Sequence, residues 1–297
     1  MKICIFGGNG FIGSNLAKEY QKKGHIISIY TQTKIDKEIK IKNNYKIKYN
    51  EKNFSKILKN KFDIIYFLSG NSNQETSKSD IYYDLNTTFN TFVHLLEAVK
   101  KSKSKPPIWF ASSVVVYGVN NKPLKENFAR NPVSYYAISK YLCENTSKFY
   151  CDNFKMNIGI MRIFSTFGPG LRRQVIFDTI KKIKTKDNFK MFGNGNEKRD
   201  FGFIDDQIKS IILLSSKVKK PVGGIYNIAT GKAYTIKEIV NKLVKISKKK
   251  VYFEFTKKRR SFDTKNFIAD KSKVNKIIGS FKNTSIDVAL KKTYDSF

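Results

Sequence analysis

The chain has 297 residues and a formal net charge of +33, which results from 57 Lys or Arg against 24 Asp or Glu. A hydrophobic fraction of 40% with 24 Phe excludes a disordered chain, and no apolar run approaches the roughly 20 residues that span a bilayer. Three cysteines without a C-x-x-C spacing, and an N-terminus without the features of a signal peptide, predict a reducing, cytoplasmic compartment. Two histidines far apart in the sequence argue against a histidine-based metal site, and we expect no metal.

The positive charge has two interpretations. Only seven of the basic residues are arginine, and lysine is spread over the whole chain. Proteins that read nucleic acids more often concentrate arginine on one element, because its planar fork grips phosphates and guanine edges. We therefore expect solvated lysines and no nucleic-acid partner, although an attraction for anionic small molecules is consistent with both interpretations.

Short apolar strands alternate with helical patterns through the first part of the chain. The segment 63–68 (DIIYFL) is apolar nearly throughout, which is typical of a strand buried on both faces. The alternation predicts an α/β fold with a doubly wound parallel sheet covered by helices. The predicted strands are 2–6, 26–30, 63–68, 108–112 and 157–163, and the predicted helices are 14–23, 80–101 and 134–150.

The composition and the length of the predicted elements change after about residue 168. Loops rich in Gly, Asn and Lys, at 168–170 and 193–196, separate shorter elements. We expect the sheet domain at 1–168 and a smaller C-terminal α/β substrate-binding lobe at 169–297, from which some strands and helices return to the sheet. The helices predicted in the second part are 175–184, 205–216, 236–247 and 286–294.

A glycine-rich loop, GGNGFIG at 7–13, follows the first strand and opens the first helix. Glycine permits positive φ and lets the backbone approach a pyrophosphate, while the helix N-terminus presents free N–H groups. Within a βαβ unit this pattern predicts a Rossmann-type, dinucleotide-binding domain. The predicted cofactor contacts in the loop are Gly7, Gly10, Phe11, Ile12 and Gly13.

The end of the second strand bears on the choice of dinucleotide. An acid at that point accepts hydrogen bonds from the adenosine ribose of NAD and repels the extra phosphate of NADP. This chain has Thr31 there, with Lys34 nearby and no Asp or Glu at 29–34. We therefore favour NADP(H), and we keep NAD, bound through hydroxyls alone, as the alternative.

A serine, a tyrosine and a lysine form the candidate catalytic set. Tyr136 and Lys140 are spaced i, i+4 on a predicted helix, so they share one face. Ser113 and its neighbour Ser112 lie at the carboxyl end of a buried strand, which is where ligands of doubly wound sheets bind. The spacing carries little weight alone in a chain with 16 Tyr, so the inference depends on these companions.

The motifs together resemble the extended short-chain dehydrogenase/reductase family, in the branch that modifies nucleotide sugars. They occur in the family's order and span essentially the whole chain. The matching segments are 7–13 (GGNGFIG), 111–118 (ASSVVVYG), 136–140 (YAISK), 162–170 (RIFSTFGPG) and 193–206 (GNGNEKRDFGFIDD).

The resemblance implies a role for each member of the catalytic set. Tyr136 would be the general acid/base at the sugar C4 oxygen while a hydride moves between C4 and the nicotinamide, and Ser113 would hydrogen-bond the reacting oxygen. A phenol with an ordinary pKa of about 10 is a poor base at neutral pH. We therefore expect the ammonium of Lys140 to stabilise the phenolate and to hold the nicotinamide ribose.

The resemblance also implies substrate contacts. Arg199 and Arg260 fall where family arginines clamp the diphosphate, although Arg260 lacks the Pro-Gly that usually accompanies it. Ser165 stands where many members have an asparagine near the sugar. The acidic pair that the family's dehydratases carry is replaced by Val114 and Val115, which cannot do acid/base work, so we expect no dehydration.

With dehydration excluded, the reaction that we expect is redox chemistry at C4 of a nucleotide sugar. Our first expectation is an NADPH-dependent reduction of a nucleotide-linked 4-keto-6-deoxy-hexose, and the alternative is a 4-epimerase of the UDP-hexose type with retained NAD. A remote alternative is a non-catalytic NADP-sensing or nucleic-acid-binding relative, against which the intact catalytic set argues.

We also predict a homodimer. The resembled family pairs two such helices from each subunit in a four-helix contact, and helices 80–101 and 134–150 carry more apolar residues than one core-facing stripe needs. These are Phe89, Phe92, Val93, Leu95, Leu96, Tyr135, Ile138, Tyr141 and Leu142.

Overall fold

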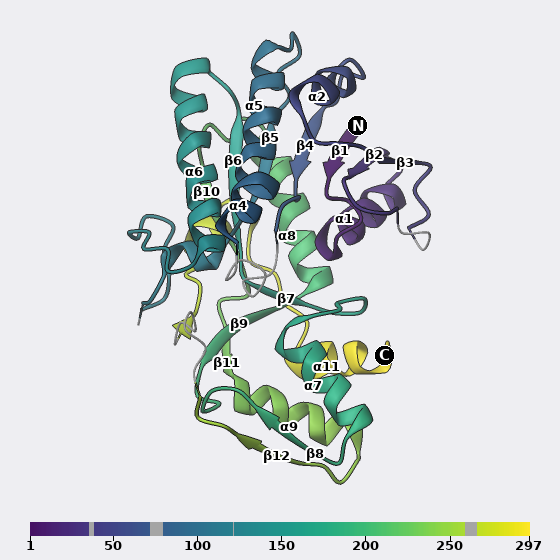
Figure 1. Ribbon diagram of the computed structural model, residues 1–297, viewed down its shortest axis with the longest axis vertical. Helices are drawn as coiled ribbons and strands as arrows, with labels where there is room; N and C mark the ends of the chain where they lie inside the picture. The colour runs from purple at the N-terminus through teal and green to yellow at the C-terminus, as the bar shows by residue number, and fades with distance from the viewer. Residues whose placement is uncertain (36–38, 72–79, 121, 259–265) are drawn as a thin grey trace.

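The structure is a computed structural model that describes residues 1–35, 39–71, 80–120, 122–258 and 266–297, and the statements below concern these residues. They form two lobes that follow one another along the long axis of the molecule (Figure 1). None of the described helices is long and apolar enough to cross a membrane.

The larger lobe is built on a seven-stranded sheet in the order β10-β6-β5-β4-β1-β2-β3, with every neighbouring pair parallel. The chain leaves β1 for β2 and β3 on one side, and it then crosses over to β4 on the other side of β1. The carboxyl ends of the strands point toward the second lobe (Figure 1). Such a crossover point is where open α/β sheets bind ligands. The strands are β1 (Lys2–Phe6), β2 (Ile26–Thr31), β3 (Asn43–Lys46), β4 (Ile64–Phe67), β5 (Ile108–Ser113), β6 (Ile158–Ile163) and β10 (Ile225–Ile228).

Helices cover both faces of this sheet, because alternate residues of the apolar strands face opposite sides. On one face, Ile3 and Ile5 of β1 share a core with helices α1 (Phe11–Lys22) and α8 (Ile204–Lys217). On the other face, Cys4 and Phe6 share a core with three helices. These are α2 (Glu51–Leu58), α5 (Thr91–Lys101) and α6 (Tyr135–Phe154).

The second lobe consists of smaller sheets with helices packed around them (Figure 1). Strand β9 pairs with β7, β11 and β13, and β8 pairs with β12 in a separate two-stranded sheet. Strand β10 and helix α8 also come from the second part of the sequence, but they belong to the large sheet and its cover. The remaining elements are β7 (Ser165–Phe167), α7 (Gln174–Thr185), β8 (Asn188–Met191), β9 (Lys198–Phe203), β11 (Ala233–Thr235), α9 (Ile236–Ser247), β12 (Tyr252–Phe255), β13 (Asn266–Phe267), α10 (Ser272–Ile278) and α11 (Ile286–Asp295).

The helix predicted at 80–101 is interrupted. A short helix α4 (Ile81–Asp84) runs into a π-helical segment η1 (Leu85–Asn90), and α5 begins after it. Within this stretch the Thr87 hydroxyl donates to the Tyr83 carbonyl at 2.6 Å, and the Thr91 hydroxyl donates to the Thr87 carbonyl at 2.8 Å. Threonine hydroxyls that bond to the preceding turn bend helices, and π-turns are frequent at functional sites.

Candidate active site

The predicted cofactor loop is a tight cradle between β1 and α1. Gly7 has φ +81°, and a Cβ on Gly13 would lie 2.4 Å from the Gly7 carbonyl oxygen. Gly10 is the N-cap of α1 and offers no capping side chain, so the first-turn N–H groups remain for an anion. Phe11 and Ile12 form that first turn. A dinucleotide pyrophosphate fits this backbone, since Cβ atoms at Gly7 and Gly13 would collide with neighbouring backbone and prevent the tight turn that gathers the N–H groups.

The end of β2 presents hydroxyl and amide groups. Thr31 is buried, and its Oγ1 lies 3.0 Å from the Thr33 Oγ1 and accepts from the Thr33 N–H at 3.2 Å. Lys34 is exposed, and its carbonyl accepts a hydrogen bond from the Asn9 amide at 3.4 Å. No acidic side chain occurs at residues 31–35 of this edge. Ribose hydroxyls and a phosphate are both compatible with such a surface.

Ser113, Tyr136 and Lys140 come together at the carboxyl end of β5. Ser113 is the last residue of β5, and α6 begins at Tyr135, where the Ser134 hydroxyl caps the helix by accepting from the Ala137 N–H at 3.2 Å. The Ser113 side chain interacts with the Tyr136 phenol. The Lys140 Nζ lies 5.9 Å from the centre of the Tyr136 ring. The second lobe faces this end of the sheet (Figure 1).

The two adjacent serines have different environments, as the pleat of a strand requires. Ser112 is buried, and its hydroxyl donates to the Glu144 Oε1 at 2.6 Å on the side of α6 that faces the sheet. Ser113 faces Tyr136. The sequence left open which serine would serve the catalytic set, and the side chain that reaches the phenol is Ser113.

Burial dominates the electrostatics of the catalytic set. It raises the pKa of Tyr136 above its ordinary value, against the hydrogen bond from Ser113 and the positive charge of Arg173, which lower it. Burial also lowers the pKa of Lys140 to about 8. Ser113 and Arg173 lower the pKa of the phenol, and the stabilisation of the phenolate by Lys140 stays a prediction. The Lys140 Nζ donates to the Ala111 carbonyl at 2.9 Å.

A buried ion pair between Arg162 of β6 and Glu144 of α6 lies next to strand β5. Arg162 on β6 donates from Nε to the Glu144 Oε1 at 2.9 Å and from Nη2 to the Glu144 Oε2 at 2.6 Å. Its Nη1 donates to the Glu126 carbonyl at 3.1 Å. Ser112 and Arg130 complete the surroundings of the carboxylate. The network therefore joins β5, β6, α6 and the loop after β5.

Two of the predicted substrate residues, Ser165 and Arg199, lie on strands of the second lobe. Ser165 is the first residue of β7, opposite Phe201 of β9. Arg199 is on β9, where its guanidinium lies 5.0 Å from the centre of the Phe267 ring and donates to the Lys198 carbonyl at 3.0 Å. Arg260 lies outside the described residues.

The sequence analysis missed two charged residues that act on the phenol. Arg173 precedes α7 directly after the loop 168–170, and Asp84 ends α4. Arg173 stands next to the GPG turn, three residues beyond a segment that the analysis singled out, so its position was a usable signal. Nothing in the local sequence distinguishes Asp84 from a surface acid, because its burial depends on the packing of α4 against α6.

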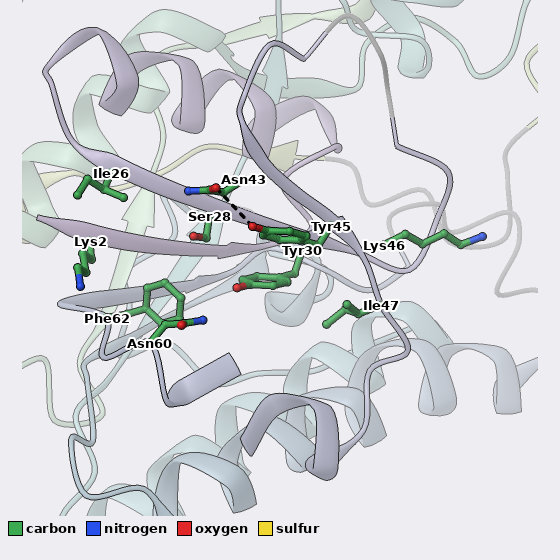
Figure 2. Close-up of a pocket in the computed structure, with 10 residues that line it drawn as sticks. All are labelled: Lys2, Ile26, Ser28, Tyr30, Asn43, Tyr45, Lys46, Ile47, Asn60 and Phe62. Carbon is green, nitrogen blue, oxygen red and sulfur yellow. Dashed lines mark hydrogen bonds between the residues drawn. The ribbon is translucent and has the colours of Figure 1, made fainter. Parts of the chain in front are cut away.

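A separate hollow of about 500 Å³ lies on the face of the sheet that α2 covers (Figure 2). Tyr45 stacks on Tyr30 with ring centres 5.5 Å apart, and the Tyr45 hydroxyl donates to the Asn43 Oδ1 at 3.3 Å. Lys2, Ile26 and Asn43, the first residues of β1, β2 and β3, contribute to its wall. The hollow thus extends toward the amino ends of the strands, away from Ser113, and is not part of the candidate active site.

The fold and the Ser–Tyr–Lys set define a dinucleotide-dependent enzyme of the short-chain dehydrogenase/reductase type. Comparison with known proteins narrows this class, because residues 3–229 match the NAD dependent epimerase/dehydratase family. The chain belongs to that family. The predictions of a Rossmann-type fold, of an enzyme and of the extended branch of the short-chain dehydrogenase/reductases are thereby confirmed.

Individual relatives match between 72% and 100% of the chain. An uncharacterized UDP-glucose epimerase of Bacillus subtilis, YtcB, is 28% identical over 304 residues, covering 96% of this chain and 94% of its own. A UDP-glucuronate 4-epimerase of Thermodesulfobacterium geofontis is 32% identical over 220 residues, covering 72% of this chain and 65% of its own. The crystal structure of UDP-glucuronic acid 4-epimerase from Bacillus cereus, in complex with UDP-glucuronic acid and NAD, has a TM-score of 0.91 at 26% identity, covering 100% of this chain and 98% of that one.

Proposed function

We propose that the chain is a 4-epimerase of a nucleotide-activated sugar that works with retained NAD. The observation that carries this proposal is a single acid/base group, Tyr136, beside Ser113 and Lys140, in a chain similar over its whole length to a sugar-nucleotide 4-epimerase. Inversion at C4 needs one group that takes a proton and returns it. Val114 and Val115 follow Ser113 and offer no second acid for an elimination.

Three side chains of this protein have separate roles in the reaction at C4 of the sugar. Tyr136 removes the proton of the C4 hydroxyl and gives it back to the ketone oxygen after the sugar has presented its other face. Ser113 donates a hydrogen bond to the same oxygen, and Lys140 supplies positive charge beneath the phenol. The dinucleotide, held by the loop 7–13, supplies hydride acceptance and return at C4 when it is bound.

We propose a hexuronate as the sugar, because a cation lies beside the catalytic phenol. The positive charge of Arg173 acts on Tyr136, and this half-buried guanidinium has the planar fork that pairs with carboxylates. A hexuronate has a carboxylate on C5, next to the reacting C4. Two of the relatives above act on UDP-glucuronate.

Epimerisation is tested by incubating the purified protein with UDP-glucuronic acid, with UDP-glucose as the neutral comparison, and without added cofactor. We expect conversion of the uronate to its C4 epimer, measured by ¹H NMR, and release of NAD when the protein is denatured. Arg173→Leu should raise the KM for UDP-glucuronic acid by about tenfold or more and change that for UDP-glucose little, because only the first has a carboxylate to lose. Equal effects on both substrates would contradict the carboxylate contact.

The 4-keto-reductase is the second candidate, because Thr31 and Lys34 place no acid against the extra phosphate of NADP. The comparisons support it less well than the epimerase. It predicts an enzyme that is purified without dinucleotide, binds NADPH, and oxidises it when given a 4-keto sugar nucleotide. Consumption of NADPH in that assay, with no epimerisation of UDP sugars, would replace the epimerase by the reductase.

We propose a homodimer that forms through the surface of α4 and α6. Tyr82 and Phe149 are 72% and 54% exposed, and Tyr83 of α4 and Tyr135 of α6 are exposed as well. The predicted set of apolar positions needs correction, since Phe92, Leu95 and Leu96 are fully buried in the core between α5 and the sheet. They have no part in a contact with a second subunit.

A further inference from the structure

Asp84 is a fully buried carboxylate with incomplete hydrogen bonding. It ends α4 with 0% of its surface exposed. Its Oδ1 accepts a hydrogen bond from the Asn71 Nδ2 at 2.8 Å, while its Oδ2 is buried without a partner among the described residues. Leaving one oxygen of a buried carboxylate unpaired costs free energy, so such a group calls for a specific compensation.

The candidate for that compensation is on the neighbouring helix. Both α4 and η1 pack against α6, whose first turns carry Tyr136 and Lys140. Lys140 is also buried; its Nζ donates one hydrogen bond, to the Ala111 carbonyl at 2.9 Å, and lies 5.0 Å from the centre of the Phe110 ring. An ammonium has three N–H donors, so this buried cation and the buried anion of Asp84 are each incompletely compensated by their own surroundings.

We propose that Asp84 is the counter-charge of the Tyr136–Lys140 pair, a positioning residue whose buried carboxylate keeps Lys140 in its ammonium form beneath the phenol. The proposal rests on the assignment of Tyr136 and Lys140 in the proposed function. Asn71 fixes the orientation of the carboxylate from the loop after β4, and its own N–H donates to the Thr88 hydroxyl of η1 at 2.9 Å. The π-helical segment is therefore part of the same arrangement.

Within the part of the chain that the structure describes, few other ionisable groups act on the pair. Burial lowers the pKa of Lys140 to about 8, and Cys143 and Asp84 act in the opposite direction. Burial raises the pKa of Cys143 to about 12, so this thiol is neutral where Lys140 titrates and cannot supply the negative charge. On the phenol, Arg173 and Ser113 lower the pKa and Asp84 raises it. Among the described residues, Asp84 is thus the carboxylate that acts on both members.

The sign of the effect follows from the charge. A negative group favours the protonated form of a neighbour, so Asp84→Asn lowers the pKa of Lys140 below about 8 and lowers that of Tyr136 as well. We expect a shift on the order of one pH unit, which is typical of a single partly desolvated charge. Asparagine has the shape of aspartate and can still pair with Asn71, so the variant should fold with an unchanged or higher Tm.

Lysine-selective NMR tests the proposal without any substrate. In protein labelled with ¹³C,¹⁵N-lysine, Lys140 should be the side chain that titrates near pH 8, identified by its loss in Lys140→Gln. Its midpoint should fall by about one pH unit in Asp84→Asn and return in Asp84→Glu, while Asp206→Asn, which alters a buried carboxylate bonded to Thr284, should leave it unchanged. The same midpoint in Asp84→Asn as in the wild type would refute the proposal.

Catalysis gives a second readout, and it separates this proposal from the proposed function. With UDP-glucuronic acid, the alkaline limb of kcat/KM should move to lower pH by the same amount in Asp84→Asn. A merely structural role would lower Tm and activity and leave the pH profile in place. If the wild type converts no UDP sugar, the proposed function fails, and the lysine titration still decides whether Asp84 sets the charge of Lys140.

Discussion

Glu144→Gln is the substitution for which the structure gives the most definite expectation. The side chain keeps its shape, but its negative charge is removed from a buried site where it receives two hydrogen bonds from Arg162 and one from Ser112. One oxygen becomes an NH₂ group that faces another donor. The guanidinium of Arg162 stays buried, and the side chain of residue 144 then offers it only the neutral amide carbonyl of glutamine.

The size of the effect follows from this geometry. Arg162 and Glu144 are 0% and 1% exposed, so neither charge can turn to water when the other is lost. Breaking a fully buried pair from one side costs about 3–5 kcal/mol, because an uncompensated charge remains inside the protein. For a domain whose whole stability is about 5–15 kcal/mol, this is a large fraction.

The measurement is urea denaturation, followed by the fluorescence of the buried Trp109. We expect the midpoint to fall in Glu144→Gln with little change in the slope of free energy against urea. The double variant Arg162→Met/Glu144→Gln should lose less than the single one, because the cation that then lacks Glu144 is Arg130, whose side chain is partly exposed to solvent. The exposed pair Lys148–Asp152 provides the matched control, and Asp152→Asn should not move the midpoint measurably. A loss below about 1 kcal/mol in Glu144→Gln would mean that the buried carboxylate does not hold Arg162 as described.

Three further predictions concern the active site and assembly. Tyr136→Phe should bind NAD normally and lose activity by about 10²–10⁴-fold, and retention of more than about a tenth of wild-type turnover would exclude Tyr136 as the acid/base. Thr31→Asp should shift the ratio of NAD to NADP affinity toward NAD by on the order of 1–3 kcal/mol, measured by calorimetry on dinucleotide-free protein, because the new carboxylate repels the extra phosphate. Light scattering at micromolar concentration should give the mass of a dimer, and Tyr82→Lys with Phe149→Lys should give a monomer; a monomeric wild type would contradict the assembly.

The architecture of the large sheet was predictable because its signals are local and strong. The apolar residues 3–6 and 64–67 are buried on both faces of the sheet, and the glycine loop marks the first crossover. Strand β3 has the sequence NNYK, which is polar and lies at the edge of the sheet, so no apolar run indicates it. Edge position, which permits such a sequence, is a property of the assembled sheet.

The candidate site was predictable to the extent that topology gathers its residues. Ligands of parallel sheets bind where the strands end, so the topology brings the end of β5 and the start of α6 together at that edge. The choice between Ser112 and Ser113 depended on which serine pairs with Glu144, a residue 32 positions away. The interruption at η1 depended on threonine hydroxyls that compete for the carbonyls of the preceding turn. Neither follows from spacing.

The acid strength of Tyr136 is set by groups from separate parts of the chain. Burial alone would keep the phenol protonated at neutral pH, since it raises the pKa of Tyr136. Ser113 at the end of β5 and Arg173 before α7 act against burial, while Asp84 at the end of α4 acts with it. The Y-x-x-x-K spacing therefore indicates the chemistry that we propose, and groups at the end of β5, before α7 and at the end of α4 act on the pKa of the phenol. Substitution at Arg173 or Asp84 should consequently move the pH dependence of turnover in opposite directions, Arg173→Leu toward higher pH and Asp84→Asn toward lower.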